Sequence, residues 1–370
     1  MKLRITGIIS FVLVALTGYA CTSAIISADR TVSGRPLLWK HRDTSNANSR
    51  IAYIKATNDG DLDYVGLFNA NDPNNRQAWM GMNEAGFAIM NTASYNLLPK
   101  GEKSKDREGR VMAQALRKCR TVDDFARFLD SLPRPIGVEA NFGVIDALGN
   151  GAYFETGNYK YQRFDLKDAP DGILVRTNYS HSGREGAGSG YMREDNAVHQ
   201  LLPFVKQRKV TPELLTETLS RRFYRDDAGY DFLDSVPRII QDKDFIPRYT
   251  SVATCVVEGM KPLKTLPDSA TVAQQYIMWT GLGYPPAAEI MPVWCRPDGV
   301  AKDLQGTGPN NHAPLADKAQ NARLDVFGSK PKEGKKRFVD LDKLVNEQGT
   351  GYMQLVLPKN RETYRSYRDR

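Results

Sequence analysis

The chain has 370 residues, of which 41% are hydrophobic and 25% are charged, a balance typical of a soluble globular protein. Its formal net charge is +8, and the basic residues are scattered apart from two runs, 100–110 and 330–337. Because no aromatic residues alternate with these basic residues, we interpret the runs as solvated loops and expect no nucleic-acid partner. The four cysteines form no C-x-x-C pair and the four histidines have no ligand spacing, so we expect neither a metal site nor another cofactor.

The first 20 residues have the three parts of a cleavable secretory signal. A basic start precedes an apolar run over 8–16, and small residues stand just before Cys21. We therefore expect residues 1–20 to be removed and the mature protein to be secreted or periplasmic. The apolar run is shorter than the ~20 residues that a spanning helix needs, and no later segment approaches that length. We expect no transmembrane segment after cleavage.

A lipid anchor is an alternative explanation of the same cysteine. Bacterial lipoproteins also carry a cysteine directly after the signal, although an aliphatic residue usually stands three positions earlier, where this chain has Gly18. In that case the mature protein would be attached to a membrane through Cys21.

Cleavage before Cys21 would give one residue both a thiol and a free α-amine. An α-amine has a reference pKa of roughly 7.7–8.0, so near neutral pH much of it is able to take a proton from the thiol. This is the chemistry of an N-terminal nucleophile hydrolase. The sequence leaves the pairing of the other three cysteines, Cys119, Cys255 and Cys295, open, although we expect them to be buried.

Beyond Cys21, short apolar runs bounded by turn residues predict strands, and longer periodic stretches predict helices. Thr121 with Asp124 three residues later has the spacing of a helix capping box. The predicted strands cover 22–27, 36–39, 87–91, 141–145, 152–156, 172–177, 251–257 and 275–280, and the predicted helices cover 111–119, a segment from Thr121, 191–204 and a segment from Thr211.

No linker divides the chain, so we expect a single domain over 21–370 with a polar, partly helical tail from about residue 314. Strands at both ends with helices between them favour an α+β fold, in which one sheet packs on another and helices cover both.

Two segments near Cys21 carry a family resemblance. The sequence is C-T-S at 21–23 and G-R-P-L-L-W-K-H-R-D at 34–43. Together they resemble the opening strands of the choloylglycine hydrolase and penicillin acylase family of N-terminal nucleophile hydrolases, which includes the acyl-CoA:6-aminopenicillanic acid acyltransferases. The resemblance implies a four-layer αββα sandwich of two antiparallel sheets.

The resemblance also implies roles for the end of the second segment. Asp43 would return to the N-terminal cysteine and bind its α-amine. The family often has an arginine three positions before this aspartate, where this chain has Lys40, while Arg42 stands next to the aspartate. Either cation would favour the thiolate of Cys21.

Two later blocks match the family in the same way. G-M-N-E-A-G-F-A-I-M-N-T at 81–92 is similar to the family's turn and strand, whose end delivers an oxyanion-hole asparagine, here Asn91. In R-T-N-Y-S, Asn178 would be a second polar group for the substrate carbonyl or the α-amine, and Arg193 in S-G-Y-M-R would return from a helix to the site.

The sequence therefore predicts an exported cysteine amidohydrolase that cleaves a linear C–N amide bond through an acyl-enzyme on Cys21, with Asn91 and Asn178 holding the oxyanion. Alternatives are an acyltransferase of the same family, a cysteine dipeptidase, which also begins Cys-Thr, and a non-catalytic lipid-anchored binding protein. The expected partner is a small-molecule amide. Its acyl and amine parts, the choice between hydrolysis and transfer, and the oligomeric state are not readable from the sequence.

Overall fold

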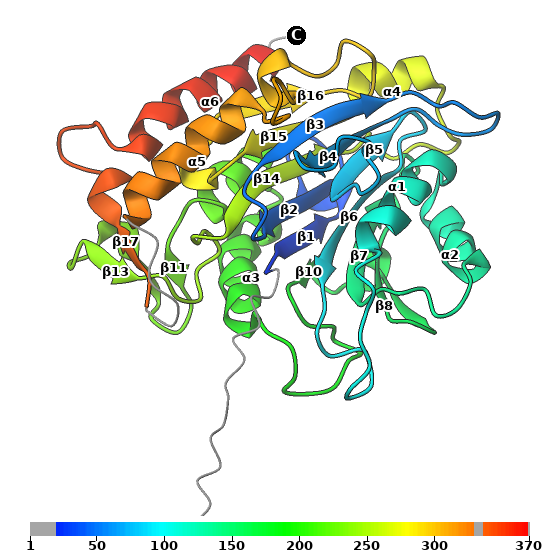
Figure 1. The fold of residues 1–370 in the computed structure, drawn as a ribbon, viewed down its shortest axis with the longest axis horizontal. Coiled ribbons are helices and arrows are strands. Elements are labelled where there is room, and N and C mark those ends of the chain that lie inside the picture. The colour runs from blue at the N-terminus through cyan, green and yellow to red at the C-terminus, as the bar shows by residue number, and fades with distance from the viewer. Residues whose placement is uncertain (1–19, 329–335, 369–370) are drawn as a thin grey trace, which may run out of the picture.

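The computed structural model describes residues 20–328 and 336–368. The nineteen residues before Ala20 lie outside this range, so the predicted signal is not part of the structure described below. Two antiparallel sheets form the centre of the molecule, with helices on both sides (Figure 1).

The first sheet has six strands in the order β10-β1-β2-β14-β15-β16. It contains both the strand that follows Cys21 and the one that ends at Asp43. Its strands are β1 (Thr22–Ile26), β2 (Leu37–Asp43), β10 (Ile173–Arg176), β14 (Ser251–Glu258), β15 (Ile277–Leu282) and β16 (Ile290–Val293).

The second sheet has seven strands that follow one another in chain order as a meander. Its strands are β3 (Ser49–Ile54), β4 (Tyr64–Asn69), β5 (Met80–Asn83), β6 (Ala88–Ala93), β7 (Ala140–Ile145), β8 (Gly151–Thr156) and β9 (Tyr161–Asp165). Two small ribbons, β11 (Tyr224–Arg225) with β12 (Tyr230–Asp231) and β13 (Ile239–Gln241) with β17 (Phe338–Asp340), lie outside the two sheets.

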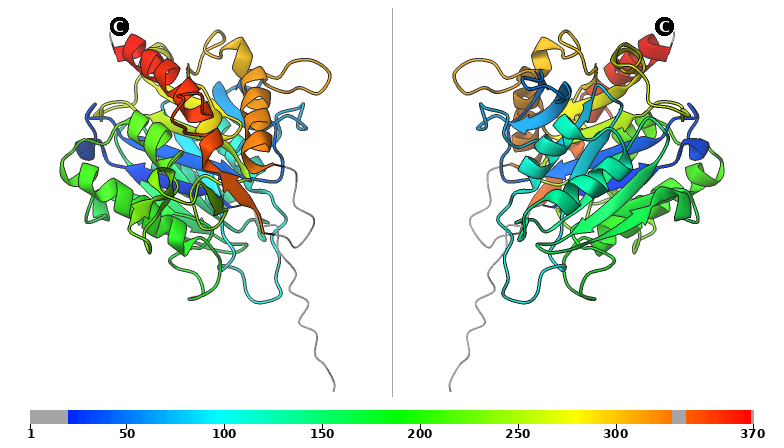
Figure 2. Two further views of the ribbon diagram at one scale, coloured as in Figure 1. Left: turned by 90° about the vertical axis from the view of Figure 1, so that its left-hand side faces the viewer. Right: turned by 90° about the vertical axis from the view of Figure 1, so that its right-hand side faces the viewer.

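Helices α1 (Glu108–Lys118) and α2 (Val122–Ser131) cover the second sheet, while α3 (Tyr191–Lys206) and α6 (Tyr352–Arg368) cover the first. The side views show α1 and α2 on one flank and α6 on the opposite one (Figure 2). The remaining helices are α4 (Ser269–Gln275) and α5 (Pro314–Phe327). The chain therefore has the four-layer αββα arrangement that the sequence predicts.

Alternation of side chains along the strands explains the layers. Ile25 and Leu38 face the second sheet and pack against its methionines, whereas Ala24 and Trp39 face α3 and α6. Apolar side chains are thus buried on both faces of β1 and β2, and polar residues within these strands must find partners inside the protein.

Local signals for two helices are confirmed. Thr121 accepts from the backbone N–H of Asp124, whose carboxylate in turn accepts from the N–H of Thr121, as a capping box requires. The segment after residue 314, predicted as a polar tail, contains α5 and α6, and Tyr364 of α6 is buried against Trp279 of β15. It packs as part of the fold.

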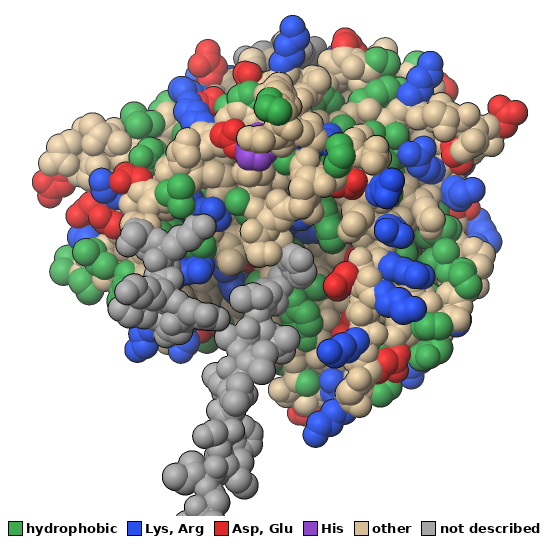
Figure 3. Space-filling model, viewed as in Figure 1, with side chains coloured by type: hydrophobic (Ala, Val, Ile, Leu, Met, Phe, Trp, Pro, Cys, Tyr) green, Lys and Arg blue, Asp and Glu red, His purple; other side chains and the backbone are tan. Residues whose placement is uncertain are grey.

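On the face drawn in Figure 3, Lys and Arg side chains lie among acidic, hydrophobic and other surface residues. None of the helices in the described ranges is both long enough and apolar enough to span a bilayer.

Candidate active site

Cys21 immediately precedes β1, and the register of β1 with β2 places Ser23 opposite Lys40. Because side chains alternate along a strand, Cys21 and Ser23 share the face of Lys40 and Arg42 that looks toward the second sheet. Contacts between the sheets confirm this direction, since Ser23 Oγ lies 2.8 Å from the hydroxyl of Tyr153 on β8. The nucleophile candidate therefore lies at the junction of the two sheets.

Two of the predicted residues, Asn178 and Arg193, surround the backbone of Cys21, and Asn178 holds its nitrogen. Its N–H donates to Asn178 Oδ1 at 2.9 Å, and Arg193 Nη2 donates to the same oxygen at 2.7 Å. The other end of the Asn178 amide, Nδ2, donates to the carbonyl of Ala93 at 2.9 Å. Arg193 Nη1 donates to the carbonyl of Cys21 and, at 3.1 Å, to Thr22 Oγ1. We call this group the nitrogen side of the site.

The position of Asn178 results from the loop after β10. A bridge between Asn178 and Ser189 closes this loop and brings the start of α3, including Arg193, back to Cys21. Since Asn178 Nδ2 is engaged by a main-chain carbonyl, the residue presents an acceptor to Cys21. This geometry favours contact with the α-amine over the alternative contact with an oxyanion.

The thiol of Cys21 faces a cavity of about 910 Å³, which also borders on Lys40 and Asn91. Cys21 is only 5% exposed, and its Sγ lies 3.9 Å from the carbonyl oxygen of Asp43. The cavity is therefore the route by which a small molecule reaches the thiol. We call the part formed by the thiol, Lys40 and Asn91 the cavity side.

Lys40 joins the two sheets beside the thiol. Its Nζ donates to Asn91 Oδ1 at 2.8 Å and to the carbonyl of Trp79 at 2.6 Å. Burial lowers the pKa of Lys40 to about 8, and the nearby thiolate form of Cys21 opposes this shift. Because Lys40 occupies the Asn91 oxygen, the Nδ2 group of Asn91 is the end that can donate to a ligand.

Asp43 lies on the opposite face of β2 from Lys40. Its carboxylate accepts from Ser251 Oγ at 2.6 Å and pairs with Arg248 Nε at 3.3 Å, while His41 Nε2 is 3.6 Å away. Burial raises the pKa of Asp43 to about 6, although Arg248 and Arg193 act to lower it. We call these four residues, His41, Asp43, Arg248 and Ser251, the Asp43 cluster.

Within the described residues the peptide nitrogen of Cys21, still bonded to Ala20, donates to Asn178 and not to Asp43, so the contact of Asp43 with a free α-amine stays a prediction. Because of strand alternation, the carboxylate points toward the face that carries Thr22. The other members of the cluster were missed in the sequence, where Arg248 and Ser251 stand some 200 positions from Asp43 without a local motif.

Arg42 contributes to the cavity wall. Its guanidinium donates to Ser49 Oγ at 2.9 Å and to Asn69 Oδ1 at 2.7 Å, and it stacks 5.0 Å from the ring of Trp79. The residue thus orders the wall beside Lys40.

The remaining cysteines lie elsewhere in the core. Cys119, Cys255 and Cys295 are buried, as expected, and all four cysteines are free thiols. Burial raises the pKa of both Cys119 and Cys255 to about 12, so these thiols are protonated at neutral pH. In the described part of the chain, no set of His, Cys, Asp and Glu side chains is arranged to hold a metal ion.

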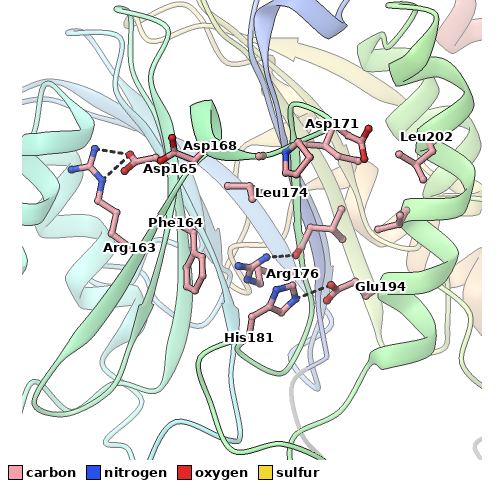
Figure 4. A pocket seen from close by; sticks show the side chains of 15 residues that line it. Arg163, Phe164, Asp165, Asp168, Asp171, Leu174, Arg176, His181, Glu194 and Leu202 are labelled. Atoms are coloured by element: carbon pink, nitrogen blue, oxygen red, sulfur yellow. Dashed lines mark hydrogen bonds and ion pairs between the residues drawn. The ribbon is translucent and has the colours of Figure 1, made fainter.

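A second cavity of about 490 Å³ lies between β9, β10 and α3 (Figure 4). His181, which follows the Asn178 motif, pairs there with Glu194 at 2.8 Å, and Arg163 pairs with Asp165 at 2.7 Å. None of the predicted site residues lines this cavity. It is therefore separate from the site at Cys21.

Comparison with known proteins supports the family assignment. Residues 43–226, about half of the chain, match the family described as acyl-coenzyme A:6-aminopenicillanic acid acyl-transferase. A comparison with curated protein sequences gave no match.

Several solved structures are similar at low identity. An N-acylethanolamine-hydrolyzing acid amidase ortholog from Caenorhabditis elegans is 16% identical with a TM-score of 0.43, covering 68% of this chain and 96% of its own. A variant of conjugated bile acid hydrolase from Clostridium perfringens is 12% identical with a TM-score of 0.43, covering 74% and 92%. Penicillin V acylase from Agrobacterium tumefaciens is 11% identical with a TM-score of 0.38, covering 74% and 86%.

At these identities and TM-scores we transfer no site residue from the solved structures. The family match and the two-sheet fold of this chain agree with the motifs around Cys21, Asn91 and Asn178. The chain belongs to the choloylglycine hydrolase, penicillin V acylase and acyl-CoA:6-aminopenicillanic acid acyltransferase family of N-terminal nucleophile hydrolases.

Proposed function

We propose that the mature chain begins at Cys21 and is an exported cysteine amidohydrolase that cleaves a linear amide bond of a small molecule. One observation carries the proposal: the nitrogen of Cys21 donates to Asn178, which Arg193 holds in place, while the thiol faces a large cavity beside Lys40 and Asn91. The two functional groups of one residue are thus separated, one for proton transfer and one for attack.

In this mechanism the α-amine of Cys21 takes the thiol proton, and Sγ attacks the carbonyl carbon of the substrate. Asn178 Oδ1 orients the amine by accepting one of its N–H groups. Asn91 Nδ2 donates to the carbonyl oxygen as it becomes negative, and the charge of Lys40 lies behind that amide. The amine then gives its proton to the leaving nitrogen, which produces a thioester on Cys21.

Hydrolysis of the thioester repeats the sequence with water as the nucleophile, and the α-amine removes the proton from that water. Asp43 assists from the other face of β2 by fixing Arg248 and by its charge near Arg193. Removal of residues 1–20 is essential to this proposal, because in the full chain the nitrogen of Cys21 is bonded to Ala20.

Acyl transfer is the second candidate, since the family match carries the name of an acyltransferase. The same thioester would then be attacked by an amine in place of water. A partition experiment separates the two: the products are measured as an acceptor amine is increased at constant substrate. A rising share of new amide would assign transferase activity.

The test uses the mature chain against N-acyl amino acids, penicillin side-chain amides, bile-salt conjugates and dipeptides. Cys21→Ala should lower turnover on the cleaved substrate by on the order of 10⁶, because removal of a nucleophile abolishes the covalent route. The matched control is Cys255→Ala, since Cys255 is a buried thiol opposite Lys40 on β14, and its activity should remain near that of the wild type.

Full activity in Cys21→Ala would disprove the covalent mechanism. The intact mass of exported protein tests the start of the chain, because a diacylglycerol group on Cys21 adds several hundred daltons. A lipid-modified Cys21 would instead favour the anchored binding protein.

A further inference from the structure

Lys40 is a buried lysine that forms no salt bridge with a carboxylate of the described residues. It is 2% exposed, and its two hydrogen-bond acceptors, Asn91 Oδ1 and the carbonyl of Trp79, are both neutral. Within the described residues no carboxylate lies at ion-pair distance from its Nζ. Burying an ammonium group without a counter-ion is costly, so its retention beside the cavity calls for a functional explanation.

We propose that Lys40 is the positioning residue of Asn91 and the cation that stabilises the thiolate of Cys21, so that loss of its proton at alkaline pH lowers the reaction rate. The inference deepens the proposed function and rests on Cys21 being the nucleophile.

The hydrogen bond to Asn91 provides the positioning. It links β2 of the first sheet to β6 of the second, and because Nζ is a donor it can bind only the oxygen end of the amide. A rotation of the amide by half a turn would set two donors, Nζ and Nδ2, against each other, which disfavours the flipped state. Lys40 thereby directs the Asn91 donor away from itself and makes it available to the cavity.

The groups around Lys40 indicate that the thiolate of Cys21 is the negative charge with which its ammonium group interacts. Cys21 lies ahead of β1, Cys255 is opposite on β14, and Arg42 is on the same strand. Burial keeps Cys255 protonated because its pKa is raised to about 12, and Arg42 is a cation. In the described part of the chain, Nζ of Lys40 donates to two neutral oxygens, the carbonyl of Trp79 just before β5 and Oδ1 of Asn91 on β6. Cys21 therefore remains as the group whose negative charge Lys40 can stabilise.

A lysine at this position has a consequence that an arginine would not have. An arginine keeps its charge at all working pH values, whereas the pKa of Lys40 is lowered to about 8. The α-amine must be unprotonated to act as a base, which gives a rising limb near its reference pKa of roughly 7.7–8.0. Deprotonation of Lys40 adds a falling limb, and the pH profile becomes a narrow bell.

The experiment compares the mature wild type with Lys40→Arg, Lys40→Met and the control Cys255→Ala. Two rates are followed from about pH 6 to 10: kcat/KM on the amide that the wild type cleaves fastest, and alkylation of Cys21 by iodoacetamide. Lys40→Met should lower kcat by roughly 10²–10³, as for loss of an oxyanion donor, and should move thiol alkylation to higher pH. Lys40→Arg should keep activity within about 10-fold and lose the falling limb, and Cys255→Ala should keep the bell.

The double variant Lys40→Met with Asn91→Ala tests whether one residue acts through the other. If Lys40 positions Asn91, the loss of kcat in the double variant should be smaller than the two single losses combined, because Asn91→Ala already removes the positioning effect and only the effect of Lys40 on the thiolate is left to lose. A falling limb that persists in Lys40→Arg would overturn the proposal, as would fully additive losses in the double variant.

Failure of the inference can be distinguished from failure of the proposed function. If no amide is cleaved although alkylation of Cys21 shifts in Lys40→Met, the amidohydrolase proposal is wrong and the pairing of Lys40 with the thiol stands. If Lys40→Met does not fold by circular dichroism, Lys40→Arg alone decides through its pH profile.

Discussion

The nitrogen side and the cavity side of Cys21 differ in how completely their polar atoms are used. On the nitrogen side both ends of the Asn178 amide are engaged, and Arg193 donates to three oxygens. On the cavity side, Asn91 is held only by its oxygen and borders a space of about 910 Å³. A fully satisfied network holds a group in place, whereas a donor facing a cavity is available to a ligand.

The two sides also come from different parts of the fold. The nitrogen side is built mainly by the loop after β10 and by α3, which cover the edge of the first sheet. The cavity side combines β2 of the first sheet with β6 of the second. Each half of the proposed chemistry can therefore be altered separately by substitution.

Aspartate substitutions distinguish an acceptor from a donor, and they give the largest effect expected from this comparison. Asn91→Asp removes the donor and places a negative charge beside the developing oxyanion, so turnover should fall by roughly 10²–10³. Asn178→Asp keeps the oxygen that accepts from Cys21 and from Arg193 but loses the donor to the carbonyl of Ala93, so turnover should fall by about 10-fold, less than in Asn91→Asp. Steady-state kinetics on the same amide measure both.

Equal losses in the two aspartate variants would show that Asn178 is also a donor to the substrate, as the sequence comparison alone suggests. Little loss in Asn91→Asp would remove Asn91 from the oxyanion site. Asn91→Ala serves as the charge-free control for the first variant.

Local sequence signals predicted much of the fold. The helix after Thr121 is predicted by its cap, and strands such as β7 and β14 are predicted by short, mostly apolar runs. Strands β3, β4 and β5 were missed. The last of these has only four residues, Met80–Asn83, and the second half of it falls in the predicted turn over 82–86. The strand exists because β4 and β6 pair with it on both sides. Pairing of this kind depends on other strands of the fold, so the strand propensity of the four residues themselves does not predict it.

The helix predicted to start at Thr211 is confirmed at its start, where Pro212 and Glu213 are helical and Thr211 Oγ1 accepts from the N–H of Leu214. The sequence does not predict that the helix continues as a short π-helix, Leu214–Leu219. Leu215 and Leu219 are buried in the core beneath α6, and Ser220 bonds to Thr254 of β14. Packing against the first sheet, rather than the N-terminal signal, sets this geometry.

For the site, the motifs predict which residues gather near Cys21 but not where their side chains point or whether they donate or accept. Motif order placed Asn178 and Arg193 near Cys21, and the structure brings them together. Whether Asn178 donates or accepts depends on the carbonyl of Ala93, which lies on the other sheet. The direction of Asp43 depends on strand alternation and on Ser251, its cross-strand partner on β14. These are long-range features without a local pattern.

The second prediction concerns stability on the nitrogen side. Arg193→Met removes hydrogen bonds to Asn178, Thr22 and the carbonyl of Cys21 and leaves these buried oxygens without that donor, so the free energy of unfolding should fall by about 2 kcal/mol. The control is Lys206→Met in the same helix, where the exposed side chain should contribute within about 0.5 kcal/mol. Urea unfolding of both variants measures the difference, and equal stabilities would mean that Arg193 is not a structural clamp.

The smallest expected effect is a pH dependence of stability that arises in the Asp43 cluster, next to the nitrogen side and the cavity side of Cys21. Burial lowers the pKa of His41 well below its ordinary value of 6.5, and Arg248 and Arg193 act in the same direction. The folded state therefore keeps His41 neutral, while the unfolded state takes up a proton as the pH falls below about 6.5. Stability from this residue is present above that pH and is lost on acidification, by at most about 1.4 kcal/mol per pH unit.

Asp43 has the opposite sign, because its pKa is raised from 3.8 to about 6. Its contribution to stability is present below its ordinary pKa and is lost as the pH rises through 6.

His41→Gln removes only the histidine effect and retains a side-chain amide donor for Ser251. Between about pH 6.5 and 5.5 the variant should lose about 1 kcal/mol less stability than the wild type. Urea unfolding at both pH values measures this difference, with His199→Gln, a 62% exposed histidine, as the control that should follow the wild type. Parallel pH dependence in wild type and His41→Gln would mean that His41 is protonated in the folded protein and pairs with Asp43 as an ion.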